Sequence, residues 1–225
     1  MRLGILGGTF DPIHLGHLRT AEEIGQELDL EKVYLIPSAS PPHKSKEPVT
    51  PFHHRLAMLQ LAASNSYLLE ALDLEGKRSG FSYSIETLRD FHRIFKPNPE
   101  IFFIIGTDAF LEIKAWKEYQ NLFDYAHFVI IHRTGYGVER LESFLLDLDL
   151  EVRKTDQRNM FIMPTGNTLL IMTPTIMDIS SSRIREMVTE GKSIHFLVPE
   201  LVRDYILEKG LYMNYANPRQ GKIVS

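Results

Sequence analysis

Two histidines near the start of the chain, His14 and His17, stand three residues apart shortly after Gly7, Gly8 and Thr9. In the first turn of a helix this spacing places both imidazoles on one face. Glycines ahead of the helix let a ligand approach backbone N–H groups without meeting a Cβ atom. Because the amino end of a helix already favours an anion, two added imidazole donors predict a polyphosphate site.

Further residues that could bind a nucleotide also follow other short apolar runs, which we expect to be buried strands. They are His43 and Lys44 after 33–36, Gly106 and Asp108 after 101–105, Arg133 after 127–131, and Ser182 with Arg185 after 168–172. Because the carboxyl ends of parallel strands meet at one edge of a sheet, we expect these residues to converge with His14 and His17.

Other standard catalytic motifs do not account for this set. The sequence contains no GxxxxGK[ST] loop, no GxGxxG turn after the first strand, no HExxH and no GxSxG. Many phosphate donors without an evident nucleophile or general base suit nucleotidyl transfer, in which the substrate supplies the nucleophile. A substrate phosphate oxygen would attack the α-phosphorus of a nucleoside triphosphate and expel pyrophosphate. Mg²⁺ would arrive with the triphosphate, and we predict no metal site of the protein's own.

The candidate residues have distinct expected roles in such a reaction. His14 and His17 would donate hydrogen bonds to phosphate oxygens as charge develops, an effect worth roughly 3 kcal/mol for each well-placed donor. Ser182 and Arg185, three residues apart at a helix start, would hold the departing β- and γ-phosphates. Asp108 would bind ribose hydroxyls, as an acidic residue after a strand often does.

Strand and helix patterns alternate along nearly the whole chain. Strands are expected at 3–6, 33–36, 67–72, 101–105, 127–131 and 168–172, and helices at 15–28, 51–63, 84–95, 137–149, from 179 and at 199–209. Thr50 and Ser84 are the predicted N-caps of two of these helices, and 150–167 has no clear pattern. The alternation predicts an α/β fold with a doubly wound, mainly parallel sheet flanked by helices. We expect one domain over 1–212 and a polar tail at 213–225.

Composition limits the class of protein. The chain has 225 residues, a formal net charge of −4, 44% hydrophobic residues and no cysteine. The negative charge argues against nucleic acid or an anionic membrane as partner, and no run of about 18 apolar residues occurs. The lack of cysteine excludes disulfides and a thiolate nucleophile and is compatible with the cytoplasm, where we expect the protein to act. Association into homo-oligomers is left open by the sequence.

The motifs that carry this chemistry are also those of a known family. They are GGTFDPIHLGH at 7–17, PSASPPHK at 37–44, FSYSIETL at 81–88, IIGTDAFLEIKAW at 104–116, ISSSRIR at 179–185 and VRDYILEKGLY at 202–212. In these segments the chain resembles the bacterial nicotinate mononucleotide adenylyltransferases of the HxGH nucleotidyltransferase superfamily. The resemblance implies a Rossmann-like nucleotidyltransferase fold. It also implies transfer of the adenylyl group of ATP to nicotinate mononucleotide in NAD biosynthesis, giving deamido-NAD and pyrophosphate.

The resemblance divides the site residues between two substrates. It implies that ATP is bound by Gly7, Gly8, Thr9, Phe10, His14, His17, Gly106, Asp108, Ser182 and Arg185, of which His14, His17 and Arg185 act in catalysis. It implies that the acceptor is bound by Lys44, Ser84, Trp116 and Arg133. The residue types fit, because Trp116 could stack on a pyridine ring. Backbone N–H groups at the helix start near Ser84 would favour a carboxylate over an amide.

Two alternatives remain open from the sequence. The chain could be another HxGH transferase, with nicotinamide mononucleotide or phosphopantetheine as acceptor, although its length, the PPHK segment and Trp116 favour the nicotinate compound. It could instead be a non-catalytic nucleotide-binding regulator, which would bind ATP without releasing pyrophosphate. The joint presence of both histidines, Ser182 and Arg185 argues for an enzyme.

Overall fold

The structure of the chain is a computed structural model. It describes residues 1–40, 49–78, 80–132, 141, 143–145, 147–148, 150–157 and 159–213. Two predicted acceptor-binding residues, Lys44 and Arg133, lie outside the described residues, as do residues 214–225 of the predicted tail. Within the helix predicted at 137–149, the described residues 141 and 143–145 are helical.

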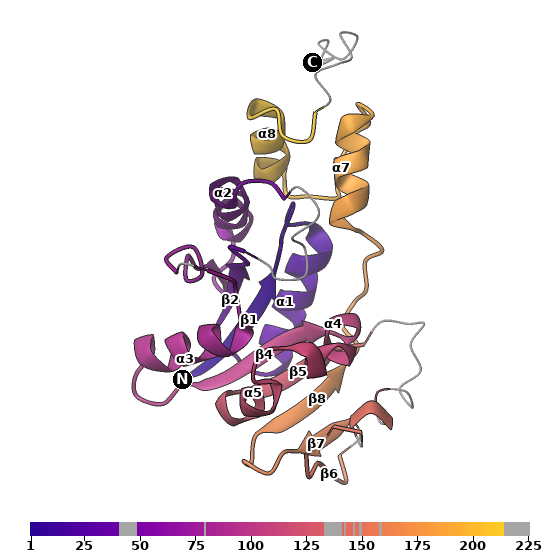
Figure 1. Cartoon of the computed structure of the whole chain (residues 1–225). Helices are drawn as coiled ribbons and strands as arrows, with labels where there is room; N and C mark the ends of the chain where they lie inside the picture. Colours follow the sequence, from indigo (N-terminus) through magenta and orange to yellow (C-terminus); the bar gives the residue numbers. More distant parts are fainter. Residues whose placement is uncertain are drawn as a thin grey trace.

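One sheet of eight strands among the described residues forms the centre of the fold, in the order β3-β2-β1-β4-β5-β8-β7-β6 (Figure 1). The parallel strands are β1 (Arg2–Gly8), β2 (Lys32–Pro37), β3 (Leu69–Ala71), β4 (Glu100–Gly106), β5 (His127–Ile131) and β8 (Thr168–Met172). Two short strands, β7 (Met160–Ile162) and β6 (Arg153–Lys154), continue the sheet in antiparallel pairing. The mainly parallel sheet predicted from the sequence is confirmed.

Helices cover both faces of the sheet because its central strands are apolar on both sides. The helices α1 (Leu15–Glu27) and α2 (Phe52–Ala63) pack on one face, and α7 (Ser181–Thr189) and α8 (Glu200–Glu208) join the same apolar cluster from beyond the carboxyl end of β1 (Figure 1). The other face is covered by α3 (Ser84–Ile94), α4 (Thr107–Leu111) and α5 (Tyr119–Tyr125). In β4, Phe103 and its alternate neighbours join the second group, whereas Phe102 and Ile104 join the first. This two-sided core is the doubly wound architecture predicted from the sequence.

The chain reverses its direction across the sheet between β1 and β4. From β1 it proceeds outward through β2 and β3, and it then returns to place β4 on the other side of β1, followed by β5. In open α/β sheets, ligands bind beyond the carboxyl ends of the strands at such a switch point. Figure 1 shows α7 and α8 at the end of the molecule toward which β1 points. A ligand site is therefore expected at the turns after β1 and β4.

Three local predictions are corrected by the structure. Pro51, not Thr50, is the N-cap of α2, since the helix begins at Phe52, one residue later than predicted, and the Thr50 N–H donates to the Asp11 carboxylate at 3.2 Å. Ser84 is the first helical residue of α3, and Tyr83 is its N-cap. Residues 150–167, for which no element was predicted, contain β6 and β7. These two strands are short and are defined by backbone pairing rather than by apolar periodicity.

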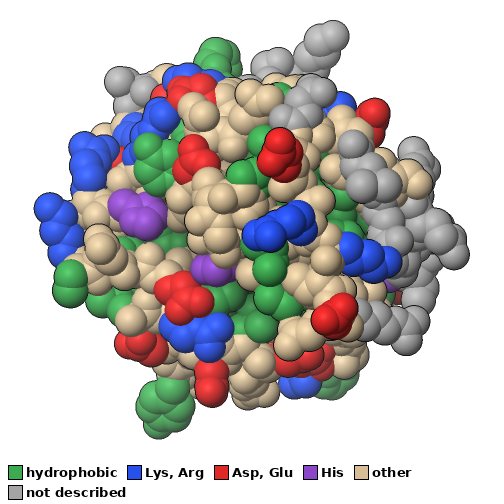
Figure 2. Space-filling view, turned by 90° about the horizontal axis from the view of Figure 1, so that it is seen from below, with side chains coloured by type: hydrophobic (Ala, Val, Ile, Leu, Met, Phe, Trp, Pro, Cys, Tyr) green, Lys and Arg blue, Asp and Glu red, His purple; other side chains and the backbone are tan. Residues whose placement is uncertain are grey.

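Figure 2 shows acidic and basic side chains interspersed over the face that it displays, without a continuous basic stripe on that face. Charged side chains also pair across neighbouring strands, such as Arg2 of β1 with Glu100 of β4 at 3.3 Å. Among the described residues, the helices are all too short or too polar to span a membrane.

Candidate active site

His14 and His17 cap the start of α1 reciprocally. Nδ1 of His14 accepts a hydrogen bond from the His17 backbone N–H at 3.4 Å, and Nδ1 of His17 accepts one from the His14 backbone N–H at 3.3 Å. The two rings stack with their centroids 3.6 Å apart. Because each Nδ1 accepts, each neutral ring carries its proton on Nε2. The cap therefore fixes the tautomer in which both Nε2 atoms are donors.

Gly16 separates the two histidines because a side chain there would press on His14. A Cβ atom built at Gly16 would lie 3.1 Å from Nδ1 and 3.2 Å from Cε1 of His14. At Gly7, by contrast, such an atom would have nothing within 4 Å among the described residues. The backbone at Gly7 therefore faces open space, as the predicted approach of a ligand requires.

The turn between β1 and α1 holds a strained residue. Phe10 has a φ angle of 49°, a left-handed conformation that costs a non-glycine residue of order 1–3 kcal/mol. Its side chain is buried, and its ring meets the edge of His17 with the centroids 5.1 Å apart. Phe10, predicted as an ATP-binding residue, can therefore offer a ligand its backbone, while its ring supports His17.

Neighbouring elements brace this turn from two sides. Nη1 of Arg55, on α2, donates to the carbonyl oxygen of Thr9 at 2.8 Å. Nη1 of Arg185, on α7, donates to the carbonyl oxygen of Asp11 at 2.8 Å. Both donors are charged, and such hydrogen bonds are stronger than neutral ones. The strained residue thus lies between two carbonyl groups that arginines hold in place.

Ser182 and Arg185 both lie at the start of α7. The N-cap of this helix is Ser180, whose hydroxyl accepts a hydrogen bond from the Arg183 N–H at 3.2 Å. Nη2 of Arg185 donates to the Ser182 hydroxyl at 3.3 Å. Arg183 pairs with Glu186 at 3.0 Å on the exposed side of the helix. The structure therefore brings Ser182 and Arg185 together beside the turn and leaves Arg183 on the surface.

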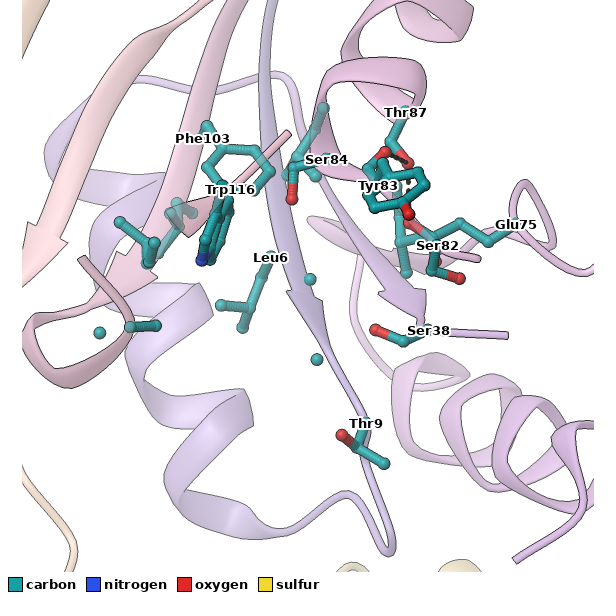
Figure 3. Close-up of a pocket in the computed structure, with 18 of the residues that line it drawn as sticks. Leu6, Thr9, Ser38, Glu75, Ser82, Tyr83, Ser84, Thr87, Phe103 and Trp116 are labelled. Atoms are coloured by element: carbon teal, nitrogen blue, oxygen red, sulfur yellow. Dashed lines mark hydrogen bonds between the residues drawn. The ribbon is translucent and has the colours of Figure 1, made fainter. Parts of the chain in front are cut away.

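A cavity of about 510 Å³ lies at the carboxyl ends of β1 and β4. Its lining includes six of the predicted site residues, namely Gly7, Gly8, Thr9, Ser84, Gly106 and Trp116. Figure 3 shows Trp116 and Phe103 on one side, Tyr83, Ser82 and Ser38 across from them, and Thr9 at the far end. Ser182 and Arg185 line a separate hollow of about 300 Å³ along α7. The turn after β1 thus lines the larger cavity, and Arg185 joins the smaller hollow to the same turn through the Asp11 carbonyl oxygen. Four other predicted residues within the described chain line neither space, namely Phe10, His14, His17 and Asp108.

Trp116 lies in the wall of the larger cavity, immediately after the 3₁₀ turn η2 (Ile113–Ala115). Its half-buried ring meets Phe103 edge to face, with the centroids 6.4 Å apart. The next residue, Lys117, pairs with Glu86 of α3 at 2.6 Å and lies 4.6 Å from the centre of the Tyr83 ring. These contacts tie the segment that carries Trp116 to the start of α3.

A buried polar network near the start of α3 was not predicted. The Thr87 hydroxyl donates to Oε1 of Glu75 at 2.7 Å and accepts from Nη2 of Arg78 at 2.7 Å. Arg78 also pairs with Asp90 at 3.3 Å. Glu75 is only 8% exposed and lines the cavity, and its Oε2 has no hydrogen-bond partner among the described residues. Arg78 lies 3.5 Å from Oε1 of Glu75 and is therefore shared between the carboxylates of Glu75 and Asp90.

Gly106 and Asp108 lie at the carboxyl end of β4. Gly106 is the N-cap of α4, and a Cβ atom built on it would come within 2.5 Å of Oδ1 of Asp108. Asp108 itself is exposed. Glycine therefore allows the carboxylate to fold back over the backbone, and of these two residues Gly106 lines the cavity whereas Asp108 does not.

Three residues that hold the turn after β1 were also missed. Arg55 is 1% exposed, and burial lowers its pKa while the nearby Asp11 raises it. Asp11 is 5% exposed and accepts a hydrogen bond from the Tyr212 hydroxyl at 2.7 Å. Helical spacing could have revealed Arg55, since it lies on the stripe of α2 that includes Met58 and Leu59. No sequence signal joins Asp11 to Tyr212, which is 201 residues away.

Comparison with known proteins relates the whole chain to one group of enzymes. Residues 5–187 match the cytidylyltransferase-like family. A probable nicotinate-nucleotide adenylyltransferase of Desulfatibacillum aliphaticivorans is 43% identical over 95% of this chain and 100% of its own length. A protein of the same description from Geotalea uraniireducens is 41% identical over 94% of this chain and 98% of its own length.

Solved structures show the same fold. The nicotinic acid mononucleotide adenylyltransferase of Plasmodium falciparum, complexed with NaAD, superimposes with a TM-score of 0.69 at 23% identity. The alignment covers 94% of this chain and 97% of that one. A second structure of that enzyme, complexed with APC, gives a TM-score of 0.66 at 23% identity, covering 94% and 96% of the two chains. At this level of identity the likeness concerns the fold, which agrees with the Rossmann-like architecture expected from the sequence.

Proposed function

The chain belongs to the nicotinate-nucleotide adenylyltransferase family, and we propose that it transfers the adenylyl group of ATP to nicotinate mononucleotide. The products would be deamido-NAD and pyrophosphate. The observation that carries this proposal is the reciprocal cap of His14 and His17 beside a cavity at the switch point of the sheet. Relatives of that name match nearly the full length of the chain, which supports the same reaction.

The ATP side of the site would be the turn after β1 together with the start of α7. Backbone N–H groups near Gly7, with open space above them, suit phosphate oxygens. The Nε2–H groups of His14 and His17 would stabilise charge that develops on the α-phosphate. Ser182 and Arg185 would hold the leaving pyrophosphate, and Asp108 would bind ribose hydroxyls. Gly8, Thr9, Phe10 and Gly106 would complete this side mainly through their backbones.

The acceptor side would be the 510 Å³ cavity. Trp116 offers a half-buried aromatic ring for stacking on the pyridine. The first N–H groups of α3, from Ser84 onward, point out of the helix end and favour a carboxylate over an amide. Lys44 and Arg133, which lie outside the described residues, stay predictions as partners of the acceptor phosphate and base.

The chemical step needs no protein nucleophile. A phosphate oxygen of nicotinate mononucleotide would form a bond to the α-phosphorus of ATP, and the bond from that phosphorus to the oxygen bridging to the β-phosphate would break. Pyrophosphate leaves with the electron pair of that bond. The protein's contribution is alignment and charge stabilisation by His14, His17 and Arg185, which is how enzymes of phosphoryl chemistry generally act.

A divalent metal ion would accompany the triphosphate. No group of three His, Asp or Glu side chains suited to a metal ion occurs within the described part of the chain. Phosphate oxygens and water are the usual ligands of Mg²⁺ in nucleotide sites, so the donor set of this protein fits an ion that is delivered with ATP. Bound there, Mg²⁺ would neutralise charge on the phosphates.

Location and assembly stay predictions. The sequence predicts a cytoplasmic enzyme without nucleic-acid or membrane partners, and the absence of cysteine and the net charge of −4 support this. A homo-oligomer is left open. The single domain expected over 1–212 is supported by one continuous sheet. It is also supported by the hydrogen bond from Tyr212, near the end of the described chain, to Asp11 in the turn after β1.

Pyrophosphate release from Mg²⁺-ATP tests the proposal when nicotinate mononucleotide, nicotinamide mononucleotide and phosphopantetheine are offered separately. We expect release with the nicotinate compound at a much higher kcat/KM than with the amide. Release only with phosphopantetheine would retain the reaction class and refute the proposed acceptor. ATP binding without release from any acceptor would refute the enzyme and favour a regulator.

A further inference from the structure

A tyrosine near the end of the described chain contacts the turn at its beginning. The Tyr212 hydroxyl donates a hydrogen bond to Oδ1 of Asp11 at 2.7 Å, across 201 residues of sequence. The other carboxylate oxygen of Asp11 accepts from the Thr50 N–H at 3.2 Å. Since Asp11 is only 5% exposed, these donors replace the water that its charge would otherwise bind.

Asp11 lies where the turn is most constrained. It directly follows Phe10, whose φ angle is 49°, and its own carbonyl oxygen accepts from Arg185 at 2.8 Å. The next carbonyl oxygen, of Pro12, accepts from the Ser181 hydroxyl at 2.8 Å. The main chain of the turn is thus held by α7, while the Asp11 side chain is held by Tyr212 and the backbone before α2. Removing the side-chain anchor would leave Asp11, which directly follows the strained residue, held through its main chain.

Tyr212 is itself well placed to act as a donor. Its backbone has a φ angle of 62°, and its carbonyl oxygen accepts from the Thr189 hydroxyl of α7 at 2.8 Å. Burial raises the pKa of Tyr212 far above its usual value, and the negative charge of Asp11 raises it further. The phenol is therefore protonated at neutral pH and can donate to Asp11.

We propose that Tyr212 is a positioning residue for adenylyl transfer. Acting through Asp11, its hydroxyl holds residues 9–12 in the conformation that presents backbone N–H groups and His14 to ATP. The C-terminal segment is thereby part of the active-site structure without touching the substrate. The inference rests on the proposed function, because that function assigns the turn to ATP.

Tyr212→Phe removes the hydroxyl alone, and Tyr205→Phe is a matched control. The Tyr205 hydroxyl also makes one hydrogen bond from the C-terminal part of the chain, to Nδ1 of His54 at 2.9 Å, but it does not contact the turn. Loss of a hydrogen bond to a buried carboxylate typically changes an equilibrium about tenfold or more. We expect Tyr212→Phe to lower kcat/KM for ATP about tenfold while the KM for nicotinate mononucleotide stays within about twofold of wild type. Tyr205→Phe should match wild type in both.

A purely structural role would lower the melting temperature of both variants without this split between substrates. Equal kinetics in Tyr212→Phe and Tyr205→Phe, or an equal rise in both KM values, would overturn the positioning role. The double variant Asp11→Ala/Tyr212→Phe tests whether Tyr212 acts through Asp11. If it does, removing the Tyr212 hydroxyl should not lower kcat/KM for ATP further once the Asp11 carboxylate is absent. A second tenfold loss in the double variant would refute action through Asp11.

Failure of the proposed function gives a different result. A wild-type protein that binds Mg²⁺-ATP but releases no pyrophosphate with any acceptor refutes the transferase assignment. Calorimetric titration of Mg²⁺-ATP into the wild type and Tyr212→Phe then decides the positioning role without turnover. Weaker binding by about tenfold in Tyr212→Phe, relative to Tyr205→Phe, supports the contact, and equal binding overturns it.

Discussion

Replacing Gly16 by alanine should separate stability from activity in this protein. Gly16 is the second residue of α1, and alanine is favoured over glycine in a helix by up to about 1 kcal/mol. The added methyl group would, however, lie 3.1 Å from Nδ1 of His14 and 3.5 Å from the carbonyl oxygen of Met177. The backbone oxygen leaves little room on one side, so the His14 ring must give way.

The size of the effect follows from the cap. The hydrogen bond from the His17 N–H to Nδ1 of His14 is already 3.4 Å long, so a shift of a few tenths of an ångström would weaken it and turn Nε2 away from its position. Loss of one well-placed donor to a developing charge costs roughly 3 kcal/mol, or about a hundredfold in kcat. We expect Gly16→Ala to reduce kcat by about ten- to a hundredfold because the displacement is partial.

The assay is single-turnover pyrophosphate release with saturating ATP and acceptor, combined with thermal unfolding. Thr20→Ala is the control, since it raises helix propensity in the same helix without approaching His14. The melting temperature of Gly16→Ala should stay close to that of wild type, because the gain in helix propensity offsets the weakened cap, while its kcat falls. Unchanged kcat in a stably folded Gly16→Ala protein would show that the position of the His14 ring does not control the reaction.

Three further predictions follow from other contacts. Trp116→Ala should raise the KM for the acceptor at least tenfold and change that for ATP little, which steady-state kinetics with each substrate varied would measure; the opposite pattern would exclude stacking. Arg185→Lys should lower kcat/KM for ATP, since lysine keeps the charge but cannot reach both Asp11 and Ser182, whereas Arg183→Lys should leave it unchanged. Burial lowers the pKa of His127 below its ordinary 6.5, so the unfolded chain takes up a proton that the folded state resists. The contribution of neutral His127 to the free energy of unfolding is complete above about pH 6.5 and is lost as pH falls through the folded pKa. Between pH 7.5 and 5, the free energy of unfolding measured with denaturant should therefore fall less in His127→Gln than in wild type.

The sequence predicted the central strands because they are buried on both faces. A segment such as 101–105 must be apolar throughout, and a continuous apolar run that ends at Gly106 is visible without knowing its neighbours. The edge strands have no such requirement. Arg153 and Lys154 are exposed in β6, and their pairing with Phe161 and Ile162 depends on backbone groups whose partners the sequence does not reveal.

The site shows the same division between local and distant contacts. The cap of His14 and His17 joins residues three apart, so its spacing was visible in the chain. The charge network of Glu75 and Arg78 is completed by Thr87, Glu86 and Asp90 on α3, and in sequence these residues have the pattern of an ordinary polar turn and helix. Contacts within one helical turn leave a periodic signal, and contacts between elements do not.

Arg185 shows why residue type alone underdetermines a role. From the sequence it was a phosphate ligand, but in the structure one of its terminal nitrogens bonds the Asp11 carbonyl oxygen and the other bonds Ser182. A guanidinium has five donors in a fixed plane, so the same side chain can brace the turn and still present N–H groups to a phosphate. The position of the Arg185 charge therefore depends on the conformation of the turn, because Arg185 is bonded to the Asp11 carbonyl oxygen. Tyr212 anchors Asp11 without carrying a charge. A substitution at Tyr212 can therefore change the conformation of the turn while the Arg185 guanidinium is still present.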